Sequence, residues 1–210
     1  MLTSVDAVLF DIDGTLLNTF DFIYGAFEHA FEVHAIDALS RRDISQLMGG
    51  PLEEVYGTMA PKHDPAALAE THRNFQTNNL HLASLFPATL EVLEELKNRK
   101  LKIGAITTRS LRTSIRSLET TGIAHFFDVV ISAEDVVRHK PDPEPILKGL
   151  AAMGISTADA VMVGDTAADI LAGKNSGTRT VAALYGFGGE SLLDLKPDYA
   201  IRDLKEFLLL

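Results

Sequence analysis

The sequence contains no cysteine among its 210 residues. This absence excludes disulfide bonds, thiolate metal sites and a cysteine nucleophile, and nothing in the chain requires an oxidising compartment. Long apolar runs are also absent, since 207–210 is far shorter than the roughly 20 residues that span a bilayer. The first residues carry no basic leader, and the apolar run 5–10 is interrupted by Asp6 and followed by Asp11, unlike a signal peptide. We therefore expect a cytoplasmic protein.

Basic residues are outnumbered: 19 lysines and arginines stand against 29 aspartates and glutamates, for a formal net charge of -10. Such a chain has no general attraction for nucleic acid or an anionic membrane, so we expect neither as a partner. If the substrate is an anion, the positive charge that binds it must be local. Hydrophobic residues make up 46% and charged residues 23% of the sequence, as in an ordinary globular protein and unlike a disordered one.

Short apolar runs alternate along the chain with stretches of helical spacing. Strands are predicted at 5–10, 102–106, 127–131, 160–163 and 179–183. Helices are predicted at 89–97, 111–120, 144–153 and 167–175, and Gly122, Gly154 and Gly177 follow the last three as C-terminal stops. This alternation predicts the α/β class, with a doubly wound, mostly parallel sheet and helices on both of its faces.

One segment, 18–83, departs from the alternation because it contains no convincing strand. Helices are predicted in it at 22–33, 43–47, 52–59 and 66–80, interrupted by Gly49-Gly50-Pro51 and Pro61. We expect an all-helical insertion at 18–83 in a core formed by 1–17 and 84–210. The alternative is a run of helices packed on the sheet itself.

Polar residues gather where the predicted strands end, which is where parallel sheets bind ligands. Asp11-Ile12-Asp13-Gly14-Thr15 follows the first strand, Thr107-Thr108-Arg109 the second, and Gly164-Asp165 the fourth, with Asp169 four residues on. Lys140 follows the third strand, before Pro141. These side chains are therefore predicted to lie at one edge of the sheet.

The carboxylates of this set predict a metal site. Asp11 and Asp13 lean to the same side if the strand continues, Asp165 joins from another strand end, and Asp169 lies one turn into the next helix. Carboxylates this close repel one another unless a cation or protons neutralise them. Oxygen ligands without cysteine favour a hard divalent ion such as Mg²⁺.

Phosphoryl transfer suits the same residues. One aspartate can attack phosphorus to form an aspartyl-phosphate, while a second protonates the leaving oxygen and later deprotonates the attacking water. Lys140 offers a point charge to the phosphate or the nucleophile, and Thr107 offers a hydroxyl. The backbone N–H groups around Gly14 and Thr108 can form an anion-binding concavity.

Each residue also has a plainer interpretation. Asp-x-Asp-Gly alone is more often a turn, Thr107 and Asp165 could each cap a helix, and Lys140 could lie on the surface. His63, His72 and His81 are nine residues apart, which is not the spacing of a helical ligand pair, so we expect surface or capping roles. We interpret Gly186-Phe187-Gly188-Gly189 as a loop that faces the site. The residues 207–210 are expected to pack against the sheet.

Taken together, the four motifs resemble those of the haloacid dehalogenase superfamily, in order and over essentially the whole chain. The resemblance implies that Asp11 is the nucleophile and Asp13 the acid/base. It implies further that Asp11, the carbonyl of Asp13 and Asp165 bind magnesium, with Asp169 in support. Gly14, Thr107, Thr108 and Lys140 would bind the substrate, and the insertion 18–83 would be a small helical cap over the site.

A finer resemblance, to phosphoglycolate phosphatases and inorganic pyrophosphatases, rests on the segments 140–145 and 169–177. It implies a small phosphorylated metabolite as partner, with 2-phosphoglycolate ranked first and pyrophosphate second. Arg41, Arg42 and Arg109 are candidates for binding the second charge of such a substrate. Thr107-Thr108-Arg109 departs from the Thr-Asn-Lys that is usual in this group.

Three other functions are less favoured. Sugar phosphomutases of the superfamily carry an arginine in the cap after a glycine loop, where this chain has Leu52-Glu53. The dehalogenase branch lacks the second aspartate, Asp13. A binding module without catalysis would be expected to have lost a carboxylate or the lysine, and none is missing. The sequence indicates no oligomeric state.

Overall fold

The computed structural model describes residues 5–46 and 50–210. Its centre is a six-stranded sheet with the strand order β5-β4-β1-β6-β7-β8, in which all neighbours are parallel. The strands are β1 (Ala7–Phe10), β4 (Lys102–Ile106), β5 (Val129–Ile131), β6 (Ala160–Gly164), β7 (Arg179–Ala183) and β8 (Tyr199–Ile201). Strands β4 and β5 lie on one side of β1, and β6, β7 and β8 lie on the other, so the strand order reverses at β1. Open parallel sheets bind ligands at such a switch point. The predicted α/β fold is confirmed.

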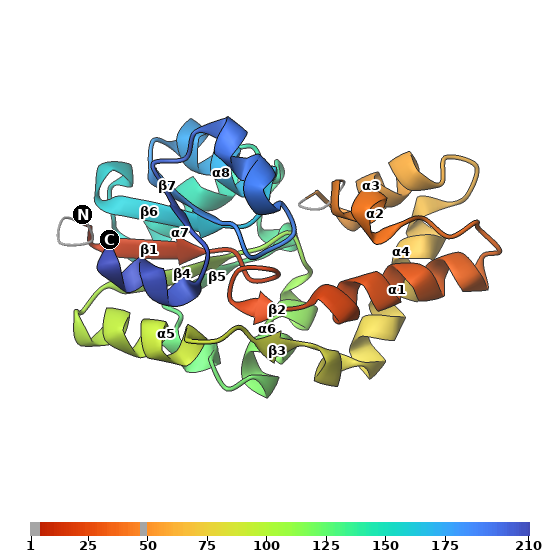
Figure 1. Cartoon of the computed structure of the whole chain (residues 1–210), viewed down its shortest axis with the longest axis horizontal. Helices are drawn as coiled ribbons and strands as arrows, with labels where there is room; N and C mark the ends of the chain where they lie inside the picture. Colours follow the sequence, from red (N-terminus) through yellow and green to blue (C-terminus); the bar gives the residue numbers. More distant parts are fainter. Residues whose placement is uncertain (1–4, 47–49) are drawn as a thin grey trace.

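Strand β1 is apolar on both faces because helices cover both faces of the sheet. Val8 and Phe10 belong to one hydrophobic cluster, which includes residues of α5 (Thr89–Asn98), α6 (Leu111–Thr120) and the C-terminal turn η7 (Leu204–Leu209). Ala7 and Leu9 belong to a second cluster, with α7 (Glu144–Met153) and α8 (Ala167–Ser176). The alternation is that of a pleated strand buried on both sides. Figure 1 shows α5 and α6 below the sheet and α8 above it.

Local signals fix where these helices begin and end. The Ser110 side chain caps α6 by accepting from the N–H of Thr113, and Gly154 and Gly177 end α7 and α8 in the left-handed conformation that glycine adopts without a Cβ clash. The predicted stops are thus confirmed for α7 and α8, and Gly122, the residue after the C-cap of α6, ends that helix in the same conformation, with a φ of +77°. Short 3₁₀ segments complete the core: η3 (Ala124–Phe126), η4 (Ala133–Asp135), η5 (Thr157–Asp159) and η6 (Gly189–Leu195).

Between β2 (Leu17–Asn18) and β3 (Ser84–Leu85), which pair as an antiparallel ribbon, the described residues form further helices and a short turn. They are α1 (Phe20–Val33), α2 (Arg41–Gln46), α3 (Leu52–Met59), α4 (Pro65–Asn78) and η2 (Leu80–Leu82). We call α1 to α4 the cap helices. They have a hydrophobic cluster of their own, and in Figure 1 they stand together on the right, beside one end of the sheet and not over its faces. The exact limits 18 and 83 stay a prediction.

Parts of two predicted features lie outside the described residues, and the structure has short strands that the sequence did not predict. Residue 47 of the predicted helix 43–47, and Gly49 of the loop that follows, lie outside the described residues. Strand β8 and the β2–β3 ribbon were missed, because strands of two or three residues are too short for alternation to mark them. In the parts of the chain that the structure describes, no helix has the length and apolar character to cross a membrane.

Candidate active site

The carboxyl ends of β1, β4 and β6 meet beneath the cap helices, and a pocket lies between them. Asp11 follows β1 directly, Thr107 follows β4, and Asp165 follows β6. From the sheet side the pocket is lined by Asp11, Asp13, Thr107, Thr108, Arg109, Ser110, Thr113, Lys140, Thr166 and Phe187. From the cap side it is lined by Ile23, Phe27, Gly50, Leu52, Val55, His72, Arg73 and Gln76. Polar groups thus face a largely apolar wall across one space.

Lys140 is the cation at the centre of this site. Its side chain is 2% exposed, and Nζ donates to Asp11 Oδ1 at 2.6 Å, Asp169 Oδ1 at 2.5 Å and the carbonyl oxygen of Ile106 at 3.1 Å. All three ammonium protons therefore have acceptors. Burial opposes the charge on Lys140, but Asp11 and Asp169 outweigh it and raise the pKa of this lysine above its ordinary value. The alternative of a surface lysine is excluded.

Three buried carboxylates lie together here, and the ammonium group of Lys140 bonds to two of them, Asp11 and Asp169. Oxygens of Asp11, Asp165 and Asp169 all lie within 4.8 Å of one another. Burial raises the pKa of Asp11 from 3.8 to about 7, against the opposing pull of Lys140. Burial, followed by the charges of Asp11 and Asp169, raises the pKa of Asp165 well above its usual range. An all-oxygen donor set with excess negative charge fits a hard divalent cation such as Mg²⁺.

Asp165 is held by two loops that have no room for a side chain. Its Oδ1 accepts from the Thr15 hydroxyl at 3.0 Å and its Oδ2 from the N–H of Phe187 at 2.7 Å. A Cβ atom on Gly14 would lie 2.2 Å from Asp165 Oδ2, and one on Gly186 would lie 2.3 Å from the same atom. Gly14 also has a φ of +84°, which favours glycine. The loop 186–189 thus faces the site, as predicted.

Asp169 orients Lys140 from the first turn of α8. Its Oδ2 accepts from the N–H and the hydroxyl of Thr166, at 3.0 Å and 2.6 Å, in a reciprocal capping box. Its Oδ1 is left to accept from Lys140. Both carboxylate oxygens are therefore engaged within the protein, which suits a supporting position beside a metal.

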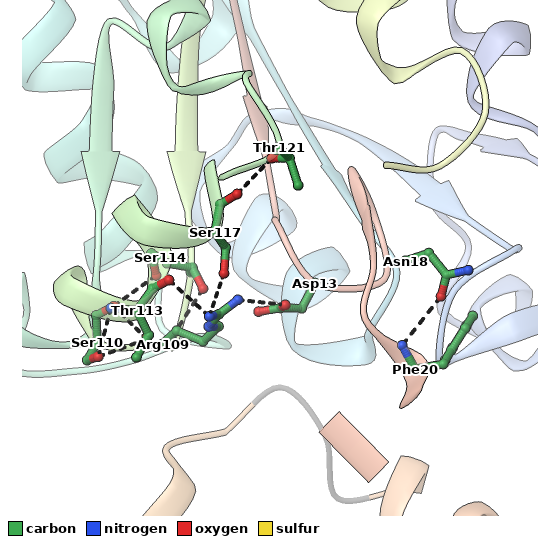
Figure 2. A network of polar contacts seen from close by, with 10 residues as sticks. Asp13, Asn18, Phe20, Arg109, Ser110, Thr113, Ser114, Ser117 and Thr121 are labelled. Atoms are coloured by element: carbon green, nitrogen blue, oxygen red, sulfur yellow. Dashed lines mark hydrogen bonds and ion pairs between the residues drawn. The ribbon is translucent and has the colours of Figure 1, made fainter. Parts of the chain in front are cut away.

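Asp13 is directed to another partner. Its carboxylate lies outside the cluster of three, and Arg109 Nη1 donates to Asp13 Oδ1 at 3.0 Å. Figure 2 shows the guanidinium between Asp13 and helix α6. The Asp13 side chain is 12% exposed and lines the pocket. Asp13 is thus placed to reach a ligand there, apart from Asp11.

Of the predicted substrate contacts, Thr107 and Thr108 line the pocket. The hydroxyl oxygen of Thr107 accepts from the N–H of Arg109 at 3.2 Å, as in a turn. The N–H of Gly14 donates to the carbonyl oxygen of Leu17 at 2.8 Å, so a substrate contact through this group would have to replace that bond.

The structure narrows the three candidate arginines to one that lines the pocket, and it corrects the expected role of His72. Among the three candidate arginines, Arg109 lines the pocket, whereas Arg41 is exposed and pairs with Asp21 and Glu28, and Arg42 is exposed. A surface or capping role for His72 is wrong, because this residue is 2% exposed and lines the pocket.

His72 is a neutral hydrogen-bonding group in the cap wall. Its Nδ1 lies 3.0 Å from the hydroxyl of the fully buried Tyr56, and burial lowers the pKa of His72 to about 3. Leu68, His72 and Gln76 repeat every four residues on the buried face of α4, and this spacing was the signal in the sequence. His63 and His81 are exposed, as expected.

Comparison with known proteins assigns this arrangement to a family. The family model described as haloacid dehalogenase-like hydrolase matches residues 8–183. Pyrophosphatase PpaX of Bacillus velezensis is 34% identical over 206 residues, covering 97% of this chain and 95% of that protein. Pyrophosphatase PpaX of Halalkalibacterium halodurans is 32% identical over 205 residues, with coverage of 97% and 95%. A haloacid dehalogenase-like hydrolase of Streptococcus pneumoniae has a similar structure, with TM-score 0.89, 28% identity and coverage of 99% and 98%.

Proposed function

The chain belongs to the haloacid dehalogenase-like hydrolases, and on that premise we propose that it is a magnesium-dependent phosphatase that acts through an aspartyl-phosphate on Asp11. The observation that carries the proposal is the buried Lys140, which bridges Asp11 and Asp169 at the carboxyl end of β1. A nucleophilic carboxylate must be ionised and fixed in direction; Lys140 fixes Asp11 Oδ1 by a hydrogen bond and opposes the rise of the Asp11 pKa that burial causes. Sequence motifs alone do not carry this geometry.

Asp11 takes the phosphoryl group in this proposal. Lys140 holds Oδ1, and among the described residues no hydrogen bond occupies Oδ2. An Asp11 oxygen attacks phosphorus, the bond from phosphorus to the leaving oxygen breaks, and Asp13 gives that oxygen a proton. Water then attacks the phosphorus while Asp13 takes a proton from it, which releases inorganic phosphate and restores Asp11.

Magnesium would be held by Asp11, Asp165 and the backbone carbonyl of Asp13, with Asp169 in support. When bound, it neutralises charge on the transferring phosphoryl group. The excess of carboxylates over ammonium groups supports this choice. Thr107, Thr108 and Lys140 line the pocket on the same side and would contact the phosphate.

We rank pyrophosphate first among the substrates. The support is the identity of 32% and 34% to proteins named pyrophosphatase over nearly their full length. This order reverses the ranking that the sequence alone suggests, in which 2-phosphoglycolate comes first. Both are compact anions that a pocket beneath the cap helices can enclose away from water.

The test is phosphate release from pyrophosphate, 2-phosphoglycolate and p-nitrophenyl phosphate, with magnesium and with excess chelator. We expect magnesium-dependent turnover, with the highest kcat/KM on pyrophosphate. Undiminished turnover in the chelator would contradict the metal requirement. A higher kcat/KM on 2-phosphoglycolate than on pyrophosphate would restore the other ranking.

A further inference from the structure

The contacts of Arg109 set the direction of the Asp13 carboxylate. Nη1 donates to Asp13 Oδ1 at 3.0 Å, and the two side chains are 10% and 12% exposed. Within 5–46 and 50–210, no other side chain bonds to this carboxylate. Water therefore screens the pair little, unlike an exposed ion pair, and the loss of one partner leaves the other charge poorly compensated.

The far side of the guanidinium is fixed to helix α6. Nη2 donates to the carbonyl oxygen of Thr113 at 3.0 Å and to the Ser117 hydroxyl at 2.9 Å, as Figure 2 shows. The planar fork of arginine allows one side chain to hold Asp13 and α6 together, which the single ammonium of a lysine cannot reproduce. The rotamer of Arg109 is thus set by the helix, and the position of Asp13 follows from it.

A third contact reaches the cap helices. The guanidinium carbon of Arg109 lies 5.0 Å from the ring centroid of Phe22, in the first turn of α1, and Phe22 is fully buried. This is the geometry of a cation–π contact. Arg109 Nε is buried without a hydrogen-bond partner in the described part of the chain. The orientation of the guanidinium that allows the contacts with Asp13, α6 and the Phe22 ring therefore leaves one N–H donor unpaired.

We propose that Arg109 is a positioning residue: it aims the Asp13 carboxylate at the leaving-group oxygen and makes that aim depend on Phe22 of the cap. The inference rests on the proposed phosphatase activity. Arg109 acts through Asp13 and touches no reacting atom. The competing interpretation is that Arg109 binds a second anionic group of the substrate. That role would change KM for doubly charged substrates and would leave proton transfer unaffected.

Leaving groups separate the two roles. A simple alkyl phosphate releases an alkoxide that needs the proton from Asp13, whereas p-nitrophenyl phosphate releases a stable phenolate that needs it little. The measured quantity is kcat/KM, which covers the steps up to cleavage of the first bond. The variants are Arg109→Gln, Ser117→Ala, Phe22→Leu, Asp13→Asn and the double variant Asp13→Asn with Arg109→Gln.

Arg109→Gln should lower kcat/KM about ten- to a hundredfold on the alkyl phosphate and about threefold or less on p-nitrophenyl phosphate. Ser117→Ala removes one hydrogen bond and should show the same selectivity with a loss of about fivefold on the alkyl phosphate. Phe22→Leu should behave like Ser117→Ala. The double variant should lose no more than Asp13→Asn alone, because two residues that act as a unit are not additive.

Arg41→Gln is the matched control. Arg41 also lies over an aromatic ring of α1, with its guanidinium carbon 4.9 Å from the centroid of Tyr24, but it is exposed and does not line the pocket. It should leave the ratio of the two kcat/KM values unchanged. Circular dichroism and thermal unfolding check that each variant folds. If Arg109→Gln does not fold, the comparison of the two esters is made with Ser117→Ala.

Equal losses on both esters, or a double variant much worse than Asp13→Asn, would overturn the positioning role. A rise in KM confined to doubly charged substrates would overturn it in favour of anion binding. If the wild-type protein turns over no phosphate ester or pyrophosphate, the proposed function fails first, and the inference fails with it.

Discussion

At the scale of single residues, the charge balance of the site depends on very few atoms. One ammonium group, that of Lys140, is within hydrogen-bonding distance of two of the three clustered carboxylates. A substitution that changes one charge there therefore acts on chemistry and on stability at once.

Asp11→Asn should abolish turnover of every substrate and leave the fold intact, because an amide cannot form the aspartyl-phosphate. Phosphate release by the purified variant checks this, with circular dichroism for the fold. Asp21→Asn is the control, since Asp21 is an aspartate of α1 whose side chain is 73% exposed and lies away from the pocket lining. Normal activity of the Asp11 variant would mean that another group is the nucleophile.

Gly186→Ala should weaken magnesium binding. A Cβ atom there would lie 2.3 Å from both Cβ and Oδ2 of Asp165, so Asp165 and the loop that carries Gly186 must move apart. We expect the magnesium concentration for half-maximal activity to rise about tenfold or more.

Gly57→Ala is the matched control, because a Cβ atom at Gly57 comes no closer than 3.9 Å to its nearest neighbour, in Pro65. An unchanged magnesium requirement in the Gly186 variant would show that the loop 186–189 does not determine the place of Asp165.

Some residues of the site belong to sequence motifs and can be predicted, whereas others reach the site only through the packing of the folded chain. Asp11 and Asp165 follow strands directly, and Lys140 lies in the loop after β5; all three stand in recognisable segments, so the sequence predicts their proximity. Ser117 and Phe22 belong to no such motif, because their contribution depends on the direction of the Arg109 guanidinium group. That direction is set by contacts between elements far apart in the chain, which spacing does not encode.

At the scale of elements, the sheet and its helices follow from local patterns. Strands β4 and β7 and helices α6 and α7 have the predicted bounds, since each combines apolar periodicity with a clear stop. Strand β8 was missed because three residues at an edge give no periodicity. Short edge elements are held by their neighbours and not by their own sequence.

Asp128 joins three elements, and its contribution should disappear in acid. Partial burial opposes ionisation, but hydrogen bonds from Lys97, the N–H of Ile103 and Lys102 lower the pKa of Asp128 from 3.8 to about 2. A lowered pKa stabilises the fold above the unfolded-state value, so this contribution is complete at neutral pH and is lost as pH falls from about 4 to about 2. Because Asp128 is exposed and water screens its ion pairs, the contribution is less than the full 1.36 kcal/mol per pKa unit and amounts to about 1 kcal/mol.

Urea unfolding of Asp128→Asn and the wild type between pH 7 and pH 2 measures this difference. The two free energies of unfolding should converge as pH falls. Substitution of the exposed Asp194 by Asn is the control and should shift neither curve. A difference between the two free energies of unfolding that stays constant down to pH 2 would contradict the proposed contribution of ionised Asp128.

At the scale of the whole molecule, the proposed metal site should couple to global stability. Without a divalent ion, the raised pKa of Asp11, about 7, means that the folded protein holds a proton that the unfolded chain has released. This contribution is fully present below about pH 4 and is lost as pH rises to about 7. The chelated protein should therefore be less stable at pH 7.5 than at pH 5.5.

Magnesium should reverse that loss. At a concentration a hundredfold above its Kd it contributes about 2.7 kcal/mol, which for a chain of this size raises Tm by about 5–10 °C. The rise should be larger at pH 7.5 than at pH 5.5 and absent in Asp165→Asn. Equal Tm values with magnesium and with chelator, in thermal unfolding at pH 7.5, would mean that the cluster binds no divalent ion.

The ribbon formed by β2 and β3 has a consequence for how such a protein can evolve. Leu17 pairs with Leu85 and Asn18 with Ser84, so the chain leaves the sheet and returns to it at adjacent points. A different helical segment with neighbouring ends could replace the present one without altering the order of the six strands. Descendants of one ancestral gene could then acquire a new substrate in a single recombination event and inherit the phosphoryl-transfer chemistry unchanged.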